Sequence, residues 1–199
     1  MSLRPILQIG DPRLRRIAQP VDPAQLGEPI LQRLIDDMVE TMRAASGAGL
    51  AAPQVGASHR ICVVEVRNNP RYPTLPDIPL TVFVNPVIHI HPGLDPERDV
   101  VEMYEGCLSV PGLRGKVRRP RKLDLDCTDR HGTRAVLQFE GPAASVIQHE
   151  LDHLDGTLFV DRCETRSLCT LEAFERHVPV SERVRDLGTA QPPGQPARH

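Results

Sequence analysis

The sequence of 199 residues contains no tryptophan, only two tyrosines and four phenylalanines, and no excess of charge of either sign. A formal net charge of −2 at pH 7 gives no electrostatic basis for nucleic acid as the main partner. The scarcity of aromatic residues also leaves few surfaces on which bases could stack. The core must therefore be built mainly from Leu, Ile, Val, Ala and Met, and direct nucleic-acid binding is not expected.

Long apolar runs and regular cysteine spacings are also missing. No apolar run approaches the length of a membrane span, and the start, MSLRPILQIGDPRLRR, lacks the apolar segment typical of a signal peptide. The five cysteines form no C-x-x-C unit, and an odd number does not suit a secreted disulfide framework. We therefore expect a cytoplasmic protein without membrane association.

What the sequence does contain is a succession of helical and strand patterns separated by glycine and proline. The predicted elements are a helix over 27–47, a loop over 47–56, a strand over 60–66, an exposed Pro-rich loop over 67–79, a strand over 80–90, a hairpin over 121–141 that turns between Asp129 and Gly132, and a shorter helix over 167–177 with Ser167 as its N-cap. These patterns predict an α+β fold with one main sheet.

The length fits one catalytic domain, which we assign to residues 1–180. The remaining residues, 181–199, end in GTAQPPGQPARH, a stretch rich in Pro, Gly and Gln. Such a composition cannot bury enough apolar surface to fold, so we expect a flexible C-terminal tail.

The stretch VIQHELDHLDG contains the H-E-x-x-H pattern in His149-Glu150-Leu151-Asp152-His153. The apolar positions 144, 147, 151 and 154 recur at helical spacing, so the pattern is predicted to lie on a helix with one apolar face. Two histidines four residues apart can then reach one metal ion, with the glutamate beside it. A catalytic metal site of this kind requires a third ligand.

The residues alone leave the third ligand open. A metzincin site would need a histidine at position 159, where this chain has Phe159. A downstream carboxylate could come from Glu164, Glu172 or Glu175. Upstream, Cys107 in YEGCLSVPG could complete a thiolate and two-imidazole site, although composition alone slightly favours a buried cysteine without a ligand role.

Three stretches together resemble the signature motifs of the peptide deformylases, in the order of that family: GAGLAAPQ at 47–54, EGCLS at 105–109 and QHELDHL at 148–154. The resemblance extends from about residue 4 to about residue 176. It implies an α+β fold in which mixed or antiparallel β-sheets pack around a central helix that carries HExxH. It also implies a metal-dependent hydrolase that removes the formyl group from the N-terminal formyl-methionine of new polypeptides and releases formate.

The resemblance assigns roles residue by residue. Cys107, His149 and His153 would bind one divalent ion, natively Fe(II), with zinc, nickel or cobalt as substitutes. Glu150 would transfer the proton of the attacking water. The Gln54 side-chain amide and the Leu108 backbone N–H would stabilise the oxyanion. The substrate-binding residues implied are Ala48, Gly49, Met103, Gly106, Arg114, Ser145 and Val146.

Several side chains near these motifs have two interpretations. Glu105 and Arg119 are candidates for a structural ion pair that supports the Cys107 segment. Arg114 could instead belong to a solvated basic stretch, RGKVRRPRK, and Met103 could be an ordinary core residue. Asp152 is expected to face solvent or to cap a neighbouring element.

The partners implied are N-formylmethionyl nascent peptides, and transient contact with the ribosome is compatible with this function. A monomer or a weak homo-oligomer is expected. The sequence looks bacterial and is also compatible with an organellar origin. Two alternatives are retained. The first is an HExxH metallopeptidase of another family, which needs a downstream carboxylate or histidine ligand, and the second is a non-catalytic Cys/His module, which needs four protein ligands.

Overall fold

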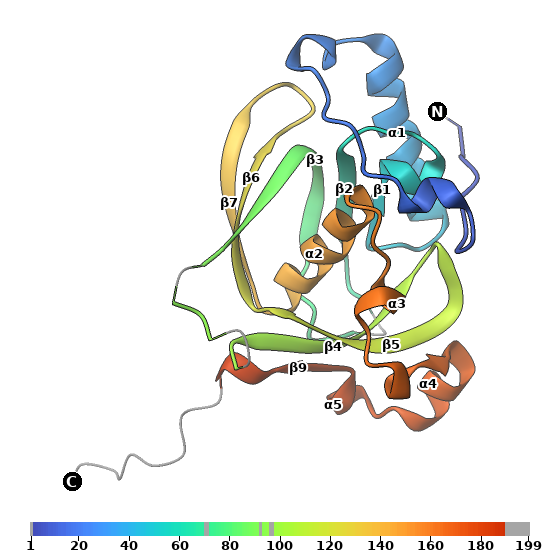
Figure 1. Ribbon diagram of the computed structural model, residues 1–199, viewed down its shortest axis with the longest axis vertical. Helices are drawn as coiled ribbons and strands as arrows, with labels where there is room; N and C mark the ends of the chain where they lie inside the picture. Colours follow the sequence, from blue (N-terminus) through green and yellow to red (C-terminus); the bar gives the residue numbers. More distant parts are fainter. Residues whose placement is uncertain (1, 70–71, 92, 96–97, 190–199) are drawn as a thin grey trace, which may run out of the picture.

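The computed structural model describes residues 2–69, 72–91, 93–95 and 98–189. Two β-sheets enclose the helix α2 (Pro142–Leu154), which carries the HExxH motif (Figure 1). The first sheet has the order β1-β2-β3-β6-β7: Gly49–Ala51, Ile61–Val66, Ile78–Ile90, Lys122–Thr128 and Arg134–Glu140. The second sheet has the order β8-β5-β4-β9: Cys169–Thr170, Val110–Pro120, Val100–Cys107 and Val184–Asp186. All neighbouring strands within them are antiparallel. The implied fold class is therefore confirmed, with two sheets where the local patterns predicted one main sheet.

The helix α2 forms where the apolar periodicity predicts it. It begins at Pro142, whose fixed φ suits the first turn, after Gly141 at φ 63°, a conformation that favours glycine. Ala144, Ile147 and Leu154 are fully buried and pack in one cluster with residues of the first sheet. That packing fixes which side of α2 faces away from the first sheet.

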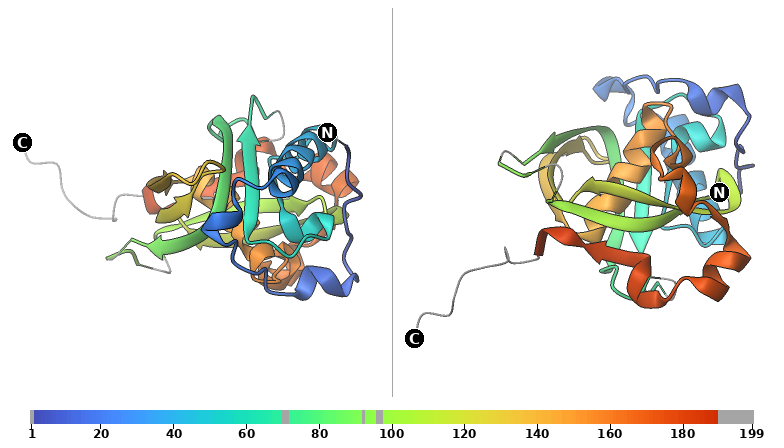
Figure 2. Two further views of the ribbon diagram at one scale, coloured as in Figure 1. Left: turned by 90° about the horizontal axis from the view of Figure 1, so that it is seen from above. Right: turned by 60° about the horizontal axis from the view of Figure 1, so that its bottom comes forward.

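The first sheet is covered on both faces, because α1 (Pro29–Ala44) packs on the side opposite to α2 (Figure 2). Along β2, Cys62 and Val64 belong to the cluster with α2, whereas Ile61 and Val63 belong to the cluster with α1. A strand buried on both faces reads as a continuous apolar run, which explains the composition of this segment.

The predicted helix at 27–47, the strands at 60–66 and 80–90, and the hairpin at 121–141 are confirmed as α1, β2, β3 and β6–β7. The hairpin turns at Gly132 with φ 89°, and Asp129 Oδ1 accepts the backbone N–H groups of His131 and Thr133. The aspartate and the glycine that predicted this turn from the sequence therefore form it in the structure.

Other local predictions were wrong. The segment 47–56, predicted as a loop, contains β1 and a 3₁₀ turn, η3 (Ala52–Val55). The last predicted helix begins later, as α4 (Leu171–His177), because the Thr170 side chain accepts from Ala173 N and caps it, while Ser167 lies in another 3₁₀ turn, η4 (Thr165–Ser167). Further short elements are η1 (Pro12–Arg15), η2 (Pro23–Gln25) and α3 (Phe159–Arg162).

The chain forms further elements next to the domain boundary expected at residue 180. Residues beyond it form α5 (Val180–Arg183), β9 and η5 (Leu187–Thr189), and β9 pairs with β4 from Val101↔Asp186 to Met103↔Val184. Figures 1 and 2 show this segment, in red, along the edge of β4. This pairing gives hydrogen-bond partners to the backbone groups along the edge of β4. The composition of the segment does not predict such a strand. The expected tail at 190–199 lies outside the described residues. In the part of the chain that the structure describes, no helix is both long and apolar enough to cross a bilayer.

Candidate metal centre

The three predicted ligands meet between the two sheets. His149 and His153 lie one turn apart on α2, with ring centroids 5.1 Å from each other, and Cys107 is the last residue of β4. One ligand atom from each residue lies within 4.8 Å of the others, and all three residues are buried. Cys107 Sγ is 3.2 Å from His153 Nε2. The helix thus supplies the two imidazoles, and a strand of the second sheet supplies the sulfur.

The surroundings of these ligands fit a divalent cation. His149 Nδ1 lies 2.8 Å from Glu105 Oε2, which leaves the other ring nitrogen for a metal, an arrangement typical of histidine ligands. Cys107 Sγ accepts from Ser109 N at 3.3 Å and lies 3.5 Å from Gln54 Nε2. Burial lowers the pKa of His153 well below its ordinary value and keeps that imidazole neutral, as a ligand must be.

A carboxylate ligand from downstream is not supported. Glu164, Glu172 and Glu175 are all exposed, and the group found among the described residues consists of Cys107, His149 and His153. Three protein ligands with sulfur and nitrogen donors make an open site rather than a closed structural one. The third ligand that the residues alone left undecided is therefore Cys107.

Glu150 lies beside the ligands and is 5 % exposed. Its Oε2 is buried and has no hydrogen-bond partner among the described residues. Burial raises the pKa of Glu150 from its ordinary value to about 7, despite the opposing influence of His149. A carboxyl group with such a pKa can both accept and return a proton near neutral pH. A Cβ atom on Gly49 would lie 2.4 Å from Glu150 Oε1, so the glycine is required for this close approach.

Gln54 is held in one orientation by its own segment. Its Oε1 accepts from Ala51 N at 2.8 Å, so its Nε2 points to Ser109 Oγ at 3.0 Å and towards the Cys107 sulfur. The side chain is 1 % exposed and lies at the wall of the same cavity. The amide donor is therefore directed towards the ligand sulfur by neighbouring backbone and side-chain atoms.

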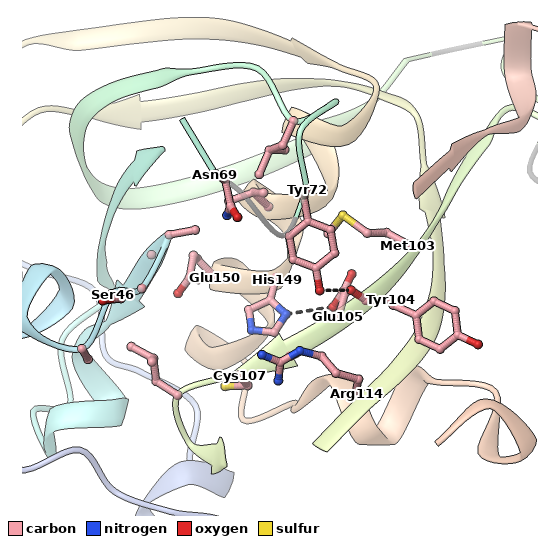
Figure 3. A pocket seen from close by; sticks show the side chains of 18 of the residues that line it. Ser46, Asn69, Tyr72, Met103, Tyr104, Glu105, Cys107, Arg114, His149 and Glu150 are labelled. Carbon is pink, nitrogen blue, oxygen red and sulfur yellow. Dashed lines mark hydrogen bonds and ion pairs between the residues drawn. The ribbon is translucent and has the colours of Figure 1, made fainter. Parts of the chain in front are cut away.

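A cavity of about 280 Å³ opens over these groups (Figure 3). Its wall includes all but two of the predicted site residues: Ala48, Gly49, Gln54, Met103, Gly106, Cys107, Leu108, Arg114, Val146, His149 and Glu150. His153 lies behind the wall. Ser145 is fully buried and is not among the lining residues, since successive helical residues point about 100° apart and Val146 takes the position facing the cavity.

Arg114 belongs to the cavity rather than to a solvated stretch. Its guanidinium covers Gly106, where a Cβ atom would lie 2.1 Å from Arg114 Nη1. Nη1 donates to Leu113 O at 2.7 Å, and Nε is buried without a hydrogen-bond partner among the described residues. The strand β5 therefore directs this arginine towards the cavity.

The cavity also has lining residues that the sequence did not suggest. Tyr72 Oη donates to Tyr104 O at 2.6 Å, which ties the Pro-rich segment to β4 (Figure 3). Leu75 in the same segment is buried, so the prediction of a wholly exposed loop was wrong. The usable signal was a tyrosine and a leucine between prolines in a chain with only two tyrosines.

The expected ion pair between Glu105 and Arg119 is present, with Nε–Oε1 at 2.6 Å and Nη2–Oε2 at 2.9 Å. Burial alone would raise the pKa of Glu105, but Arg119 and His149 hold it at about 2. The prediction for Asp152 was wrong. This carboxylate is 8 % exposed and binds two arginines, Arg119 and Arg162, because the second sheet and α3 cover that side of α2.

Comparison with known proteins agrees with this geometry. The family model described as "Polypeptide deformylase" matches residues 3–168. Peptide deformylase 2 of Ralstonia nicotianae is 47 % identical over 163 residues, 81 % of this chain and 88 % of that protein. Peptide deformylase 2 of Nostoc sp. is 43 % identical over 164 residues, 82 % of this chain and 88 % of that protein.

Solved structures show the same fold. A class I type b peptide deformylase from Acinetobacter baumannii with Met-Ala-Ser bound has a TM-score of 0.74 and 39 % identity, covering 81 % of this chain and 98 % of that one. The peptide deformylase from Thermotoga maritima has a TM-score of 0.70 and 35 % identity, covering 82 % and 99 %. Together with the three ligands and the glutamate in one cavity, these relationships show that the chain belongs to the peptide deformylase family.

Proposed function

We propose that this chain removes the formyl group from N-formylmethionyl peptides and releases formate. The observation that carries the proposal is the convergence of Cys107, His149, His153 and Glu150 on one cavity in a member of this family. An HExxH endopeptidase of another family is disfavoured, because no downstream glutamate joins the ligand group in the described chain. A structural Cys/His module is disfavoured because it needs a fourth protein ligand.

We assign Cys107, His149 and His153 as the ligands of one divalent ion, with Fe(II) as the native one. One thiolate and two imidazoles suit iron, zinc, nickel and cobalt alike, so the donor set supports a divalent metal without selecting it by affinity. When bound, such an ion supplies Lewis-acid activation of a water molecule and of the formyl carbonyl.

Glu150 is the proton-transfer residue of the proposal. Its buried carboxylate, with a pKa raised to about 7 by burial, can take the proton of the attacking water and deliver it to the departing amine. Its Oε2 has no protein partner among the described residues, so this oxygen is available to the reacting groups. Glu150 therefore acts first as a base and then as an acid.

The Gln54 amide and the Leu108 backbone N–H are assigned to the oxyanion that forms on the formyl oxygen. Oε1 of Gln54 is held by Ala51 N, which orients Nε2 into the site before substrate arrives. Donors that are already oriented stabilise a developing charge without reorganisation. Substrate would compete with Ser109 Oγ for the Gln54 donor.

The peptide is proposed to bind as an added strand between β1 and β4. Ala48 and Gly49 on one side and Gly106 on the other leave room for backbone-to-backbone contact, which is indifferent to sequence. Met103 and Val146 are assigned to the pocket for the methionine side chain, and Arg114 to the following residues of the peptide. Ser145 would support this wall from behind rather than touch substrate.

The proposed partners are nascent chains with formyl-methionine at their start, met in the cytoplasm, with at most transient contact with the ribosome. The proposed assembly is a monomer or a weak homo-oligomer. We assign catalysis to a single domain of residues 1–180, to which the described residues 181–189 add a strand at its edge.

The test measures formate release from formyl-Met-Ala-Ser and cleavage of an unblocked peptide, with metal content determined in parallel. We expect activity on the formylated peptide alone in wild type, and its loss in Glu150→Ala with the metal retained. Cys107→Ala should lose both metal and activity. A metal-loaded wild type that is inert on the formylated peptide would overturn the proposal, as would cleavage of the unblocked peptide at internal bonds.

A further inference from the structure

We propose that Asp152, held from outside by Arg162, is a positioning residue that fixes the helix bearing the two histidines relative to the strand bearing the cysteine. This inference rests on the metal centre of the proposed function. Asp152 is one of the two unspecified positions within the H-E-x-x-H pattern, and nothing in that pattern gives it a role.

The carboxylate of Asp152 is the meeting point of two arginines. Arg162 on α3 donates Nε to Oδ2 and Nη2 to Oδ1, both at 2.7 Å, in a two-bond fork. Arg119 on β5 donates Nη1 to Oδ2 at 2.8 Å. Paired bonds of this kind fix direction as well as distance. Asp152 is therefore restrained from both sides.

Arg119 passes this restraint on to the second sheet. The residue is 3 % exposed, and its Nε and Nη2 bind the two carboxylate oxygens of Glu105 at 2.6 and 2.9 Å. Glu105 Oε2 in turn lies 2.8 Å from Nδ1 of the ligand His149. An unbroken series of contacts thus runs from the half-exposed Arg162 to a metal ligand.

The series closes into a ring that includes both sources of ligands. Asp152 lies three residues after His149 and directly before His153 on α2, while Glu105 lies two residues before Cys107 on β4. The bond from Arg119 to Asp152, continued by the Arg119–Glu105 pair, therefore connects the helix that supplies the imidazoles to the strand that supplies the sulfur. A change in it alters the separation of the ligands as well as the stability of the fold.

Asp152 and Arg162 cannot act by touching substrate. Neither lines the cavity over Glu150, and both line a separate cavity on the other side of α2, together with Arg60, Arg118 and Arg119 among others. Buried ion networks are also a poor source of stability, because desolvation offsets the attraction between charges. Positioning of the ligands is thus the function that this network serves best.

A matched ion pair at the end of the same helix provides the control. Arg60 Nη1 donates to Asp155 Oδ1 at 2.6 Å, and Asp155 is the residue that follows α2. The variants are Asp152→Asn, Arg162→Gln, Arg162→Lys and, as the control, Arg60→Gln. Each is loaded with Co(II), and we measure the rate of ion loss to excess chelator and the Co(II) absorption spectrum, with thermal unfolding of the metal-free proteins alongside.

We expect Asp152→Asn to lose Co(II) about 10–100 times faster than wild type, with a changed spectrum, as for other residues that orient metal ligands. Arg162→Gln should accelerate the loss by at most about fivefold, because its ion pair is half-exposed, and Arg162→Lys should restore part of the difference. Arg60→Gln should match wild type. Wild-type rates in Asp152→Asn would overturn the proposal.

Equal acceleration in Asp152→Asn and Arg60→Gln, in step with equal losses in melting temperature, would also overturn it, because that result indicates general loosening of α2. Should Asp152→Asn fail to fold, the comparison of Arg162→Gln, Arg162→Lys and Arg60→Gln decides, and identical rates in all three would contradict the proposal. A wild type that holds Co(II) tightly but releases no formate would instead contradict the proposed function.

Discussion

The two sides of α2 are built from different interactions. Towards the first sheet, Ala144, Ile147 and Leu154 are fully buried in an apolar cluster. Towards the second sheet, the contacts are ionic, and Asp152 meets Arg119, which continues to Glu105. One helix therefore has an apolar side and an ionic side, and the metal ligands belong to the ionic one.

This difference separates stability from position. Apolar burial is non-directional and scales with the area removed from water, so it stabilises the fold without fixing atoms to fractions of an ångström. Forked ion pairs contribute little net stability but define distance and orientation. We infer that the apolar side determines whether the chain folds, and that the ionic side determines where its ligands lie.

Glu150 gives the largest expected effect of a single substitution on α2. Glu150→Gln removes the proton acceptor while keeping the shape of the side chain, and we expect kcat to fall by about 10²–10⁴-fold. Metal content should not change, because Gln at this position does not disturb the three ligands. Initial rates of formate release and metal analysis check this, and unaltered kcat would remove Glu150 from the proposed mechanism.

Gln54 tests the proposed oxyanion donor, outside α2 but on the same cavity. Gln54→Ala should lower kcat by about 10²–10³-fold, the usual loss for one such donor, with a smaller change in KM. The Ala51 N–H loses its partner in this variant, so the melting temperature is measured in parallel. A rise in KM with kcat preserved would show that Gln54 binds substrate without stabilising the transition state.

Ile147 tests the apolar side. Ile147→Ala leaves a cavity at a fully buried position, and we expect the free energy of unfolding to fall by about 2–5 kcal/mol. Below its melting temperature, the variant should keep the wild-type rate of Co(II) loss. Val136→Ala, at a strand position that is 66 % exposed, serves as the control with little change. Rapid Co(II) loss from folded Ile147→Ala would contradict the inference that the apolar side stabilises the fold without determining where the ligands lie.

Glu150 should also carry a stability cost that depends on pH. Burial raises its pKa from 4.5 to about 7, so its contribution to stability is complete below 4.5 and is lost as the pH rises through 7. Glu150→Gln should therefore stabilise the metal-free protein at pH 8 by about 3 kcal/mol and have little effect at pH 4.5. Urea unfolding at both pH values measures this, and equal effects at the two would contradict a buried, uncompensated carboxylate.

The elements that sequence periodicity predicts correctly are those whose own residues carry the signal. The HExxH helix, the strands β2 and β3 and the β6–β7 hairpin each show a local period or turn signal. The strand β4 was missed because its inward face includes Glu105 and Cys107, which interrupt an apolar alternation. Their partners on α2, His149 and His153, lie 44 and 46 residues further along the chain, so no local pattern predicts this burial.

The same reason explains the errors at the site. Asp152 appears exposed when judged by charge alone, and it is buried because Arg119 compensates its charge. The third metal ligand needed both elements in place, since Cys107 and His153 are 46 residues apart in the chain. Local patterns indicated the helix and its two histidines, while the family resemblance supplied the cysteine that completes the site.

The central claim is that the Cys107, His149 and His153 site binds the ion on which formate release depends. It is tested by assaying anaerobically prepared protein on formyl-Met-Ala-Ser before chelation, after complete metal removal, and after stepwise addition of Fe(II). The account predicts that activity disappears with the metal and returns in proportion to the ion bound, reaching its maximum at one equivalent. Activity that survives complete metal removal, or that does not return when one equivalent is bound, would contradict it.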